Sequence, residues 1–195
     1  MFRGIERILI DRHEIAERVG EIADRLASDL RAALEAEGDG AGEHRVVLIP
    51  IMTGSLVFVA DLIRRLPMML SMELVAVSSY PGQTMASKGA HLRTELPPGL
   101  EGRHVVLVDD ILDSGRTLHL VRSLVEEKKP ASVRTVVLLD KKARRAVPIE
   151  PDYAGFDIPD EFVVGYGLDY DGYYRNLPDI ATLDPGAAGG SGGPA

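Results

Sequence analysis

Two adjacent carboxylates, Asp109 and Asp110, close a short apolar run and precede a hydroxyl-rich turn centred on Gly115. A helical pattern starts at Leu118, so the turn joins a buried strand to a helix. A turn of this kind directs several backbone N–H groups at one point, where the helix N-terminus adds partial positive charge. Residues 113–117 are therefore a candidate phosphate site, although they lack the spacing of a Walker A loop.

A ribose 5-phosphate carries both kinds of group that this stretch could bind, vicinal hydroxyls and a phosphate. Asp109 and Asp110 can accept hydrogen bonds from a ribose diol or hold Mg²⁺ through water. The 5-phosphate would then be bound by Asp113, Ser114, Gly115, Arg116 and Thr117. For the aspartate pair alone, an ordinary turn with solvated acids is the simpler interpretation. The whole stretch 105–117 favours a ligand site.

The composition narrows the classes of partner and chemistry. The chain has 195 residues, enough for one domain with a sizeable core, and 45% of them are hydrophobic. Its formal net charge of −8 disfavours nucleic acid and anionic membranes as partners. The absence of cysteine excludes disulfides and thiolate chemistry. No run reaches the ~18 apolar residues of a membrane-spanning helix. The first residues lack the features of a signal peptide, so we expect a cytoplasmic protein.

Strands and helices that alternate along the chain would position the phosphate site. A capping-box spacing at Asp11 and Glu14 begins a helix whose apolar residues recur every three or four positions as far as Leu34. Apolar runs predict strands at 8–10, 46–51, 70–77, 105–108, 133–139 and 162–164, and helices at 57–66 and 118–128. This alternation predicts an α/β fold with a mostly parallel twisted sheet and helices on both faces.

Two loops, a basic cluster and a tail carry further expectations. The turn 53–55 offers a second anion cradle, unless it is a plain strand-to-helix connection. From 82 to 102 the periodicity is lost, which favours a flexible lid or binding loop over a disordered insertion. The basic cluster 140–145 is either a solvated face or part of the ligand-binding edge of the sheet. Residues 1–183 are expected to form one domain, and the Gly/Pro/Ala-rich tail 184–195 to be disordered.

Two segments resemble a known family. The stretch 105–117 closely resembles the phosphoribosyl-pyrophosphate motif of type I phosphoribosyltransferases, and 151–178 resembles the purine-binding segment of hypoxanthine-guanine phosphoribosyltransferases. The likeness covers roughly residues 5 to 183. It implies a type I phosphoribosyltransferase-like fold, with a small hood formed by the N-terminal and C-terminal pieces over the strand ends.

The resemblance also implies a reaction in purine salvage. The 5-phosphoribosyl group of phosphoribosyl pyrophosphate is transferred to N9 of hypoxanthine or guanine, which gives IMP or GMP and pyrophosphate. The family uses Mg²⁺ as its cofactor and forms dimers or tetramers, so a homodimer or homotetramer is expected.

Roles for individual residues follow from the same resemblance. Asp109 and Asp110 would hold the ribose hydroxyls and the metal environment, and Asp113 would lie near N7 as general acid/base. Ser114, Gly115, Arg116 and Thr117 would bind the 5-phosphate. Thr53 and Gly54 would form the pyrophosphate loop, and Ser79 and Tyr80 match a pair in a mobile loop that closes over the sugar.

At the base, Lys141 would reach the 6-oxygen, Phe162 would stack on the ring and Val163 would offer backbone atoms. Asp169 would serve a second Mg²⁺ and Arg175 the pyrophosphate, and Arg145 is a weaker match.

Two alternatives to this reaction stay open, and the first comes from a departure from the family. Hypoxanthine-type members usually carry a lysine where this chain has Thr53, so a positive charge is missing from the pyrophosphate loop. A non-catalytic regulator that senses phosphoribosyl pyrophosphate or nucleotides is therefore one alternative. A xanthine-preferring transferase is another, because the purine 2-position is read largely by backbone atoms.

Overall fold

The computed structural model describes residues 2–38, 42–78, 91–184 and 186. The strands are β1 (Ile5–Ile10), β2 (Val46–Met52), β3 (Ser71–Met72), β4 (Val75–Ser78), β5 (His91–Leu92), β6 (His104–Leu112), β7 (Ser132–Asp140), β8 (Tyr153–Asp157), β9 (Val163–Val164) and β10 (Ile180–Leu183). The α-helices are α1 (Arg12–Ala36), α2 (Leu56–Ile63) and α3 (Arg116–Glu126), and 3-10 turns lie at Glu43–Arg45 and Lys142–Arg144.

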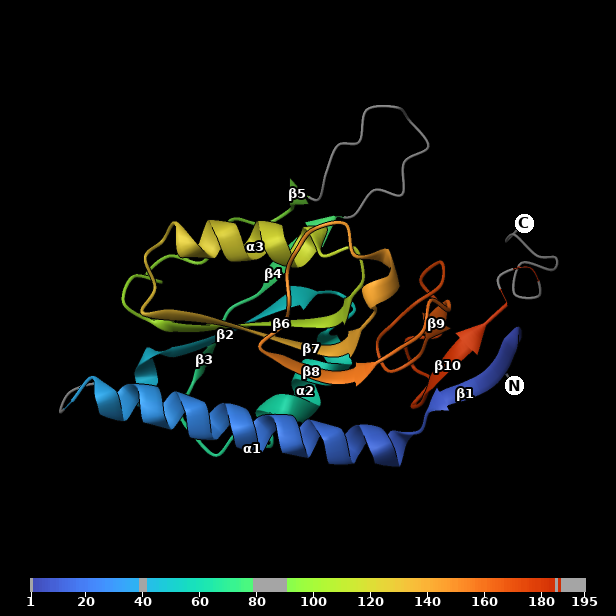
Figure 1. Cartoon of the computed structure of the whole chain (residues 1–195), viewed down its shortest axis with the longest axis horizontal. Helices are drawn as coiled ribbons and strands as arrows, with labels where there is room; N and C mark the ends of the chain where they lie inside the picture. Colours follow the sequence, from blue (N-terminus) through green and yellow to red (C-terminus); the bar gives the residue numbers. More distant parts are fainter. Residues whose placement is uncertain (1, 39–41, 79–90, 185, 187–195) are drawn as a thin grey trace.

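The main sheet has the strand order β5-β4-β2-β6-β7-β8, with β3 also paired to β2. All of its pairs are parallel except β4 with β5, so the predicted mostly parallel α/β sheet is confirmed. Helix α3 covers one face, and α1 and α2 cover the other (Figure 1). Neighbouring strand residues alternate between two cores, since Leu48 packs on the α1 side and Ile49 on the α3 side. Helices cover both faces of the sheet, so residues on both sides of each strand are buried, and the strands are continuous apolar runs in the sequence.

Helix α1 begins with the predicted capping box. The Asp11 side chain accepts hydrogen bonds from the backbone N–H groups of His13 and Glu14, and Glu14 Oε2 accepts from the Asp11 N–H at 3.0 Å. The predicted apolar face is buried from Ile15 to Leu34. Among the described residues no helix is both long and apolar enough to cross a membrane.

A second, antiparallel sheet of order β1-β10-β9 forms the hood. It lies beyond the carboxyl ends of the parallel strands (Figure 1). The two ends of the chain meet there, because Ile10 of β1 pairs with Ile180 of β10. The expected hood over the strand ends is therefore present, although β10 itself was not predicted.

The single strand predicted at 70–77 is two strands. Ser71 pairs with Val47 and Val75 with Ile51, so β3 and β4 keep one register against β2 and the ladder is interrupted between them. The interruption lies opposite Ile49 and Pro50, where a proline has no N–H to contribute to the ladder.

The expectation that 82–102 lacks regular structure is wrong at its C-terminal part. His91 and Leu92 form β5, which pairs with β4, and the Thr94 hydroxyl accepts a hydrogen bond from the Ala76 N–H at 3.0 Å. Leu100 is buried in the core on the α3 side. Residues 82–90 of the predicted lid, and residues 185 and 187–195 of the predicted tail, lie outside the described residues, so both expectations stay predictions.

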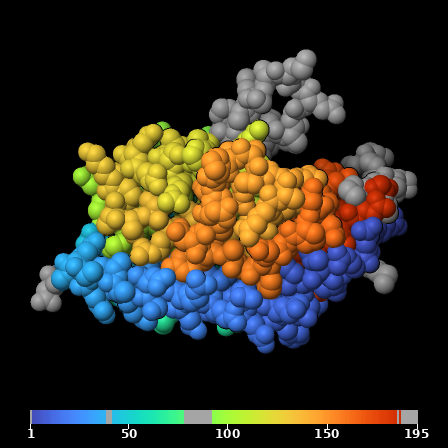
Figure 2. All heavy atoms as spheres, in the orientation of Figure 1, coloured from blue at the N-terminus to red at the C-terminus, as the bar shows by residue number. Residues whose placement is uncertain are grey.

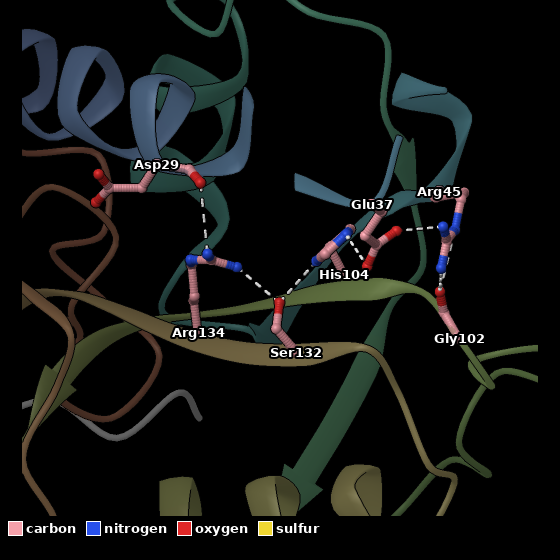
Figure 3. A network of polar contacts seen from close by, with 7 residues as sticks. All are labelled: Asp29, Glu37, Arg45, Gly102, His104, Ser132 and Arg134. Atoms are coloured by element: carbon pink, nitrogen blue, oxygen red, sulfur yellow. Dashed lines mark hydrogen bonds and ion pairs between the residues drawn. The ribbon is translucent and has the colours of Figure 1, made fainter. Parts of the chain in front are cut away.

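A polar network lies at the amino-terminal edge of the sheet, where β6 and β7 start, opposite the carboxyl ends of the parallel strands (Figure 3). His104 begins β6 and is 2% exposed, and its Nδ1 lies 2.8 Å from the Ser132 hydroxyl of β7. Its Nε2 lies 3.3 Å from Glu37 Oε1, an electrostatic contact without the alignment of a good hydrogen bond. Glu37 also pairs with Arg45, and Arg134 donates to the Ser132 hydroxyl at 2.6 Å. The network therefore joins the end of α1 to the starts of β6 and β7.

Candidate active site

A cavity of about 340 Å³ opens where β2 and β6 end and α3 begins. The polar residues that line it come from both loops that the sequence marked as anion cradles: Thr53, Gly54, Asp109, Asp110, Asp113, Ser114, Gly115 and Thr117. Arg116 is the first residue of α3, and its side chain is exposed rather than part of the lining. The cavity lies at the carboxyl edge of the parallel strands, where ligands of such sheets bind.

The adjacent carboxylates Asp109 and Asp110 are held by the backbone. The Asp110 N–H donates to Asp109 Oδ1 at 3.1 Å, and the Ile111 N–H donates to Asp110 Oδ1 at 2.9 Å. Burial, followed by the negative charge of Asp110, raises the pKa of Asp109 well above its usual range. Burial also raises the pKa of Asp110, although hydrogen bonds from Asp109 and the Ile111 N–H and the charge of Arg175 oppose that rise. Such a pair favours a ligand that brings positive charge or hydroxyl donors.

The turn into α3 has the features of a phosphate cradle. Gly115 has φ +81°, and a Cβ there would lie 2.7 Å from Ile149 Cγ2, so only glycine fits this turn. The N-cap residue Gly115 has no side chain to cap α3, and the Arg116 N–H makes only a long hydrogen bond, 3.5 Å, to the Ser114 hydroxyl. Asp113 Oδ1 is buried and has no hydrogen-bond partner among the described residues. The helix end therefore faces the cavity, and Asp113, which lines it, has a carboxylate oxygen that is not engaged by another described residue.

The loop at Thr53 and Gly54 lies directly on the aspartate pair. A Cβ on Gly54 would lie 1.7 Å from Asp110 Oδ2, so the backbone of the loop contacts that carboxylate. On its other side, the Gly54 carbonyl oxygen would lie 2.3 Å from a Cβ on Gly167 of the segment beneath the hood. The loop is thus enclosed between the carboxylates and the C-terminal segment.

Lys141 follows the strand next to the phosphate turn. Leu112 of β6 pairs with Asp140 of β7, and the Lys141 N–H donates to the Leu112 carbonyl at 2.9 Å. Lys141 is 5% exposed, and its ammonium donates to the Glu161 carbonyl at 2.9 Å and contacts Asp160 Oδ1 at 3.0 Å. The solvated-face interpretation of the basic cluster is therefore wrong for Lys141.

The other members of the basic cluster differ in burial. Lys142 and Arg144 are exposed and pair with Asp157 and Asp160. Arg145 is mostly buried and pairs with Asp140 at the end of β7. A solvated face therefore describes Lys142 and Arg144 alone.

Phe162, Val163, Asp169 and Arg175 lie in the hood strand β9 and in the chain on either side of it, and they do not line the cavity itself. In Figure 2 the orange part of the chain lies between the yellow α3 layer and the red C-terminal strand. Phe162 is 44% exposed and meets Tyr170 edge-on at 5.6 Å between ring centroids, whereas Val163 of β9 is buried. Arg175 contacts Asp169 Oδ1 at 2.7 Å and donates to the Gly167 carbonyl at 2.6 Å. Ser79 and Tyr80 lie outside the described residues.

Comparison with known proteins supports one family. The model of the phosphoribosyl transferase domain matches residues 14–171. A hypoxanthine-guanine phosphoribosyltransferase of Streptococcus pneumoniae is 39% identical over 179 residues, which are 92% of this chain and 93% of that protein. A mutant hypoxanthine phosphoribosyltransferase of Trypanosoma cruzi, solved as a ternary substrates complex, superposes with a TM-score of 0.83 at 39% identity, and the match covers 94% of this chain and 98% of the other. The chain belongs to the hypoxanthine-guanine phosphoribosyltransferase family.

Some members of this phosphoribosyltransferase family are larger proteins. A bifunctional protein TilS/HprT of Listeria innocua is 40% identical over 185 residues, which are 95% of this chain. The chain spans 27% of the length of that relative.

The donor set of this family member fits Mg²⁺ bound together with a substrate. Among the described residues no group of three metal-ligating side chains comes together. Mg²⁺ is commonly held by one or two carboxylates plus substrate phosphates, so the pair Asp109 and Asp110 at the cavity is a sufficient protein contribution. The Asp169 carboxylate is already engaged by Arg175 and by the Gly172 N–H at 2.8 Å.

The sequence did not predict two aspartates that contact residues of the site or of the segment next to it. Asp160 contacts Lys141, and Asp61 accepts a hydrogen bond from Tyr166 OH at 2.6 Å, yet neither aspartate belongs to a recognisable motif. Only a basic cluster followed by acids between two strands hinted at the first of these contacts.

Proposed function

We propose that the chain transfers the 5-phosphoribosyl group of phosphoribosyl pyrophosphate to N9 of hypoxanthine or guanine, giving IMP or GMP and pyrophosphate. The observation that carries the proposal is the cavity in which paired carboxylates and the N-terminus of α3 meet at the carboxyl edge of the sheet. Family membership over nearly the whole chain supports the same reaction.

The cavity suits a ribose 5-phosphate at both ends. The backbone N–H groups of Ser114, Gly115, Arg116 and Thr117, with the helix end, are available to the phosphate. Asp109 and Asp110 accept hydrogen bonds from the vicinal hydroxyls. The Gly54 loop lies against Asp110, and the charge of Arg175 acts on the same carboxylate, so these two groups are the proposed site of the leaving pyrophosphate. Holding both reactants in line lowers the entropic part of the barrier.

Asp113 is the proposed general acid/base at purine N7. Its free Oδ1 is buried in the wall of the cavity, next to the strand end that carries Lys141. Lys141 would donate to the purine 6-oxygen, Phe162 would stack on the ring, and the Val163 backbone would meet the base edge. The carboxyl group exchanges a proton with the base as the bond to the sugar forms.

Mg²⁺ is the proposed cofactor and would neutralise the charge of the departing pyrophosphate. Asp109 and Asp110 would hold it with the substrate, and Asp169 would serve a second ion by exchanging its contacts with Arg175 and the Gly172 N–H for the metal. Substrate turnover should therefore stop in excess chelator and return when Mg²⁺ is restored. Full turnover without a divalent ion would contradict this assignment.

The deciding experiment incubates the chain with Mg²⁺, phosphoribosyl pyrophosphate and one purine at a time, and identifies each nucleotide formed. IMP and GMP are the expected products. XMP as the main product would favour the xanthine-preferring alternative. Binding of phosphoribosyl pyrophosphate without any nucleotide product would favour the regulator, for which the uncharged Thr53 is the motivating observation.

We also propose a homodimer or homotetramer. Large apolar side chains are exposed on and after α2, among them Leu56 at 50%, Met69 at 71% and Leu74 at 54%. A protein normally covers such groups by association when they gather on one face. Light scattering on the purified chain measures the assembly directly, and a monomer at micromolar concentration would contradict the proposal. The cytoplasmic location and the absence of nucleic-acid and membrane partners stay predictions.

A further inference from the structure

Three consecutive residues beneath the hood turn the chain sharply back on itself. Gly165, Tyr166 and Gly167 have φ values of +99°, +49° and +102°. A tyrosine rarely adopts this conformation, and it persists only where the surroundings hold it. Here the Tyr166 N–H donates to the Leu177 carbonyl at 2.7 Å, and the Gly167 N–H donates to the Arg175 carbonyl at 3.0 Å.

The Tyr166 side chain attaches this turn to α2. Its ring is 7% exposed, and its hydroxyl donates to Asp61 Oδ2 at 2.6 Å. Asp61 Oδ1 is engaged by Arg64 one turn along the same helix. Burial, and then the contact with Asp61, raises the pKa of Tyr166, so the phenol stays a hydrogen-bond donor. The contact therefore joins a turn near the hood to the helix that follows the pyrophosphate loop.

Gly167, the next residue, lies against that loop. A Cβ on Gly167 would lie 2.3 Å from the Gly54 carbonyl oxygen, so the two backbones are in direct contact. The Gly167 carbonyl also accepts from Arg175 Nη1 at 2.6 Å. The guanidinium is close enough to the carboxylates for its charge to lower the pKa of Asp110. One short turn thus supports both the loop and the cation of the pyrophosphate end.

We infer that Tyr166 and Asp61 are positioning residues for the pyrophosphate end of the active site. Their hydrogen bond holds the turn in the place where Gly167 supports the Gly54 loop and orients Arg175. Neither residue lines the cavity described above. Since Thr53 brings no charge to the loop, the binding of pyrophosphate depends on the orientation of Arg175. The inference rests on the proposed function.

A second buried tyrosine provides a matched control. Tyr153 of β8 is 5% exposed, and its hydroxyl donates to Asp29 of α1. Burial, with the Asp29 contact, raises its pKa to about 12. Tyr153 packs beside Arg25 of α1, with 5.6 Å between the guanidinium carbon and the ring centroid. The two tyrosines make the same kind of contact, but only Tyr166 is next to the pyrophosphate loop.

The test compares Tyr166→Phe with Tyr153→Phe in the full chain. Each variant loses one buried hydroxyl, so both should melt at a lower temperature. Only Tyr166→Phe should weaken the calorimetric binding of magnesium pyrophosphate and raise KM for phosphoribosyl pyrophosphate, each by about tenfold. KM for hypoxanthine should stay the same in both variants. Wild-type pyrophosphate affinity in Tyr166→Phe, or an equal loss in Tyr153→Phe, would overturn the inference.

Variants of Asp61 supply an independent test. Asp61→Asn keeps an oxygen that accepts from the tyrosine hydroxyl and should retain pyrophosphate affinity. Asp61→Ala should match Tyr166→Phe, and combining the two should cost no more than either alone, because both break the same contact. If the wild type is active and Asp61→Ala binds magnesium pyrophosphate as tightly as the wild type does, the inference is overturned but the proposed function is not. A wild type that neither binds magnesium pyrophosphate nor makes a nucleotide would overturn the proposed function as well.

Discussion

At the scale of single residues, Asp113 offers the sharpest test of the chemistry. Its Oδ1 is buried without a hydrogen-bond partner among the described residues, beside a helix N-terminus that can bind the 5-phosphate. Asp113→Asn keeps the size of the side chain but cannot exchange the proton. We expect kcat to fall by ~10²–10⁴ while the calorimetric affinity for phosphoribosyl pyrophosphate changes little. A kcat near that of the wild type would rule out the general acid/base role.

Lys141 is expected to select the base. An ammonium has three donors, and those of Lys141 include one to the Glu161 carbonyl and one toward Asp160. A third donor could meet the 6-oxygen of hypoxanthine, whereas adenine presents an amino donor there. Adenine should therefore have kcat/KM lower by on the order of 10³ or more, since a site built for one hydrogen bond rejects an analogue that lacks it.

The Lys141→Ala variant checks this selection. It should lose much of the preference for hypoxanthine while its affinity for phosphoribosyl pyrophosphate stays largely intact. Competing steady-state assays with both bases decide the matter. Comparable use of adenine by the wild type would remove Lys141 from base recognition.

Residues that are consecutive in the chain could be predicted from the sequence, and residues joined by the fold could not. Asp109 to Thr117 run continuously through a strand end and a turn, so their pattern indicates their joint location. The contacts of Lys141 with Asp160 and of Tyr166 with Asp61 join segments far apart in sequence. No local periodicity marks such partners, because each is set by the packing of separate elements.

At the scale of elements, the start of α1 is fixed to the start of β10. The Arg12 side chain donates to Asp179 Oδ1 at 2.9 Å and to Oδ2 at 2.8 Å, and the Arg12 N–H donates to Oδ1 at 3.0 Å. These bonds lower the pKa of Asp179, whose residue is 4% exposed. The ionised carboxylate therefore stabilises the fold above its ordinary pKa of ~3.9, and that stability is lost as the pH falls through the lowered value.

Asp179→Asn should lower the melting temperature at neutral pH, and its difference from the wild type should shrink as the medium becomes acidic. Thermal melts at a series of pH values measure this. Glu21→Gln is the matched control, because the Arg18–Glu21 pair is exposed at 43% and 61% and should contribute little. A pH-independent gap for Asp179→Asn would contradict the assigned role.

Elements with a strong period were predicted well, and some short strands were not. The apolar face of α1 and its capping box gave both its start and its buried side. By contrast, β5 has only two residues and β10 has four that are all buried, and neither was predicted, whereas β9 lies within the strand predicted at 162–164. Segments this short carry no alternation of their own and become strands through their partners in the sheet.

At the scale of the whole molecule, the proposed site and a buried polar network lie at opposite edges of the sheet. The proposed site occupies the carboxyl edge, and the His104 network occupies the amino edge (Figure 3). Burial lowers the pKa of His104, although the facing Glu37 opposes this, and the charges of Arg134 and Arg45 add to the lowering. Neutral His104 therefore stabilises the fold at pH values above the ordinary pKa of ~6.5, and this stability is lost as the pH falls toward the lowered value.

Changing His104 should therefore alter stability and leave the chemistry intact. His104→Gln keeps a polar side chain but cannot titrate, so its melting temperature should depend less on pH between about 5 and 7 than that of the wild type. Its KM values for phosphoribosyl pyrophosphate and hypoxanthine, measured well below the melting temperature, should match the wild type. The exposed His119 of α3 supplies the control, since His119→Gln should change neither property. A His104→Gln variant with altered KM values would mean that the amino edge of the sheet communicates with the active site.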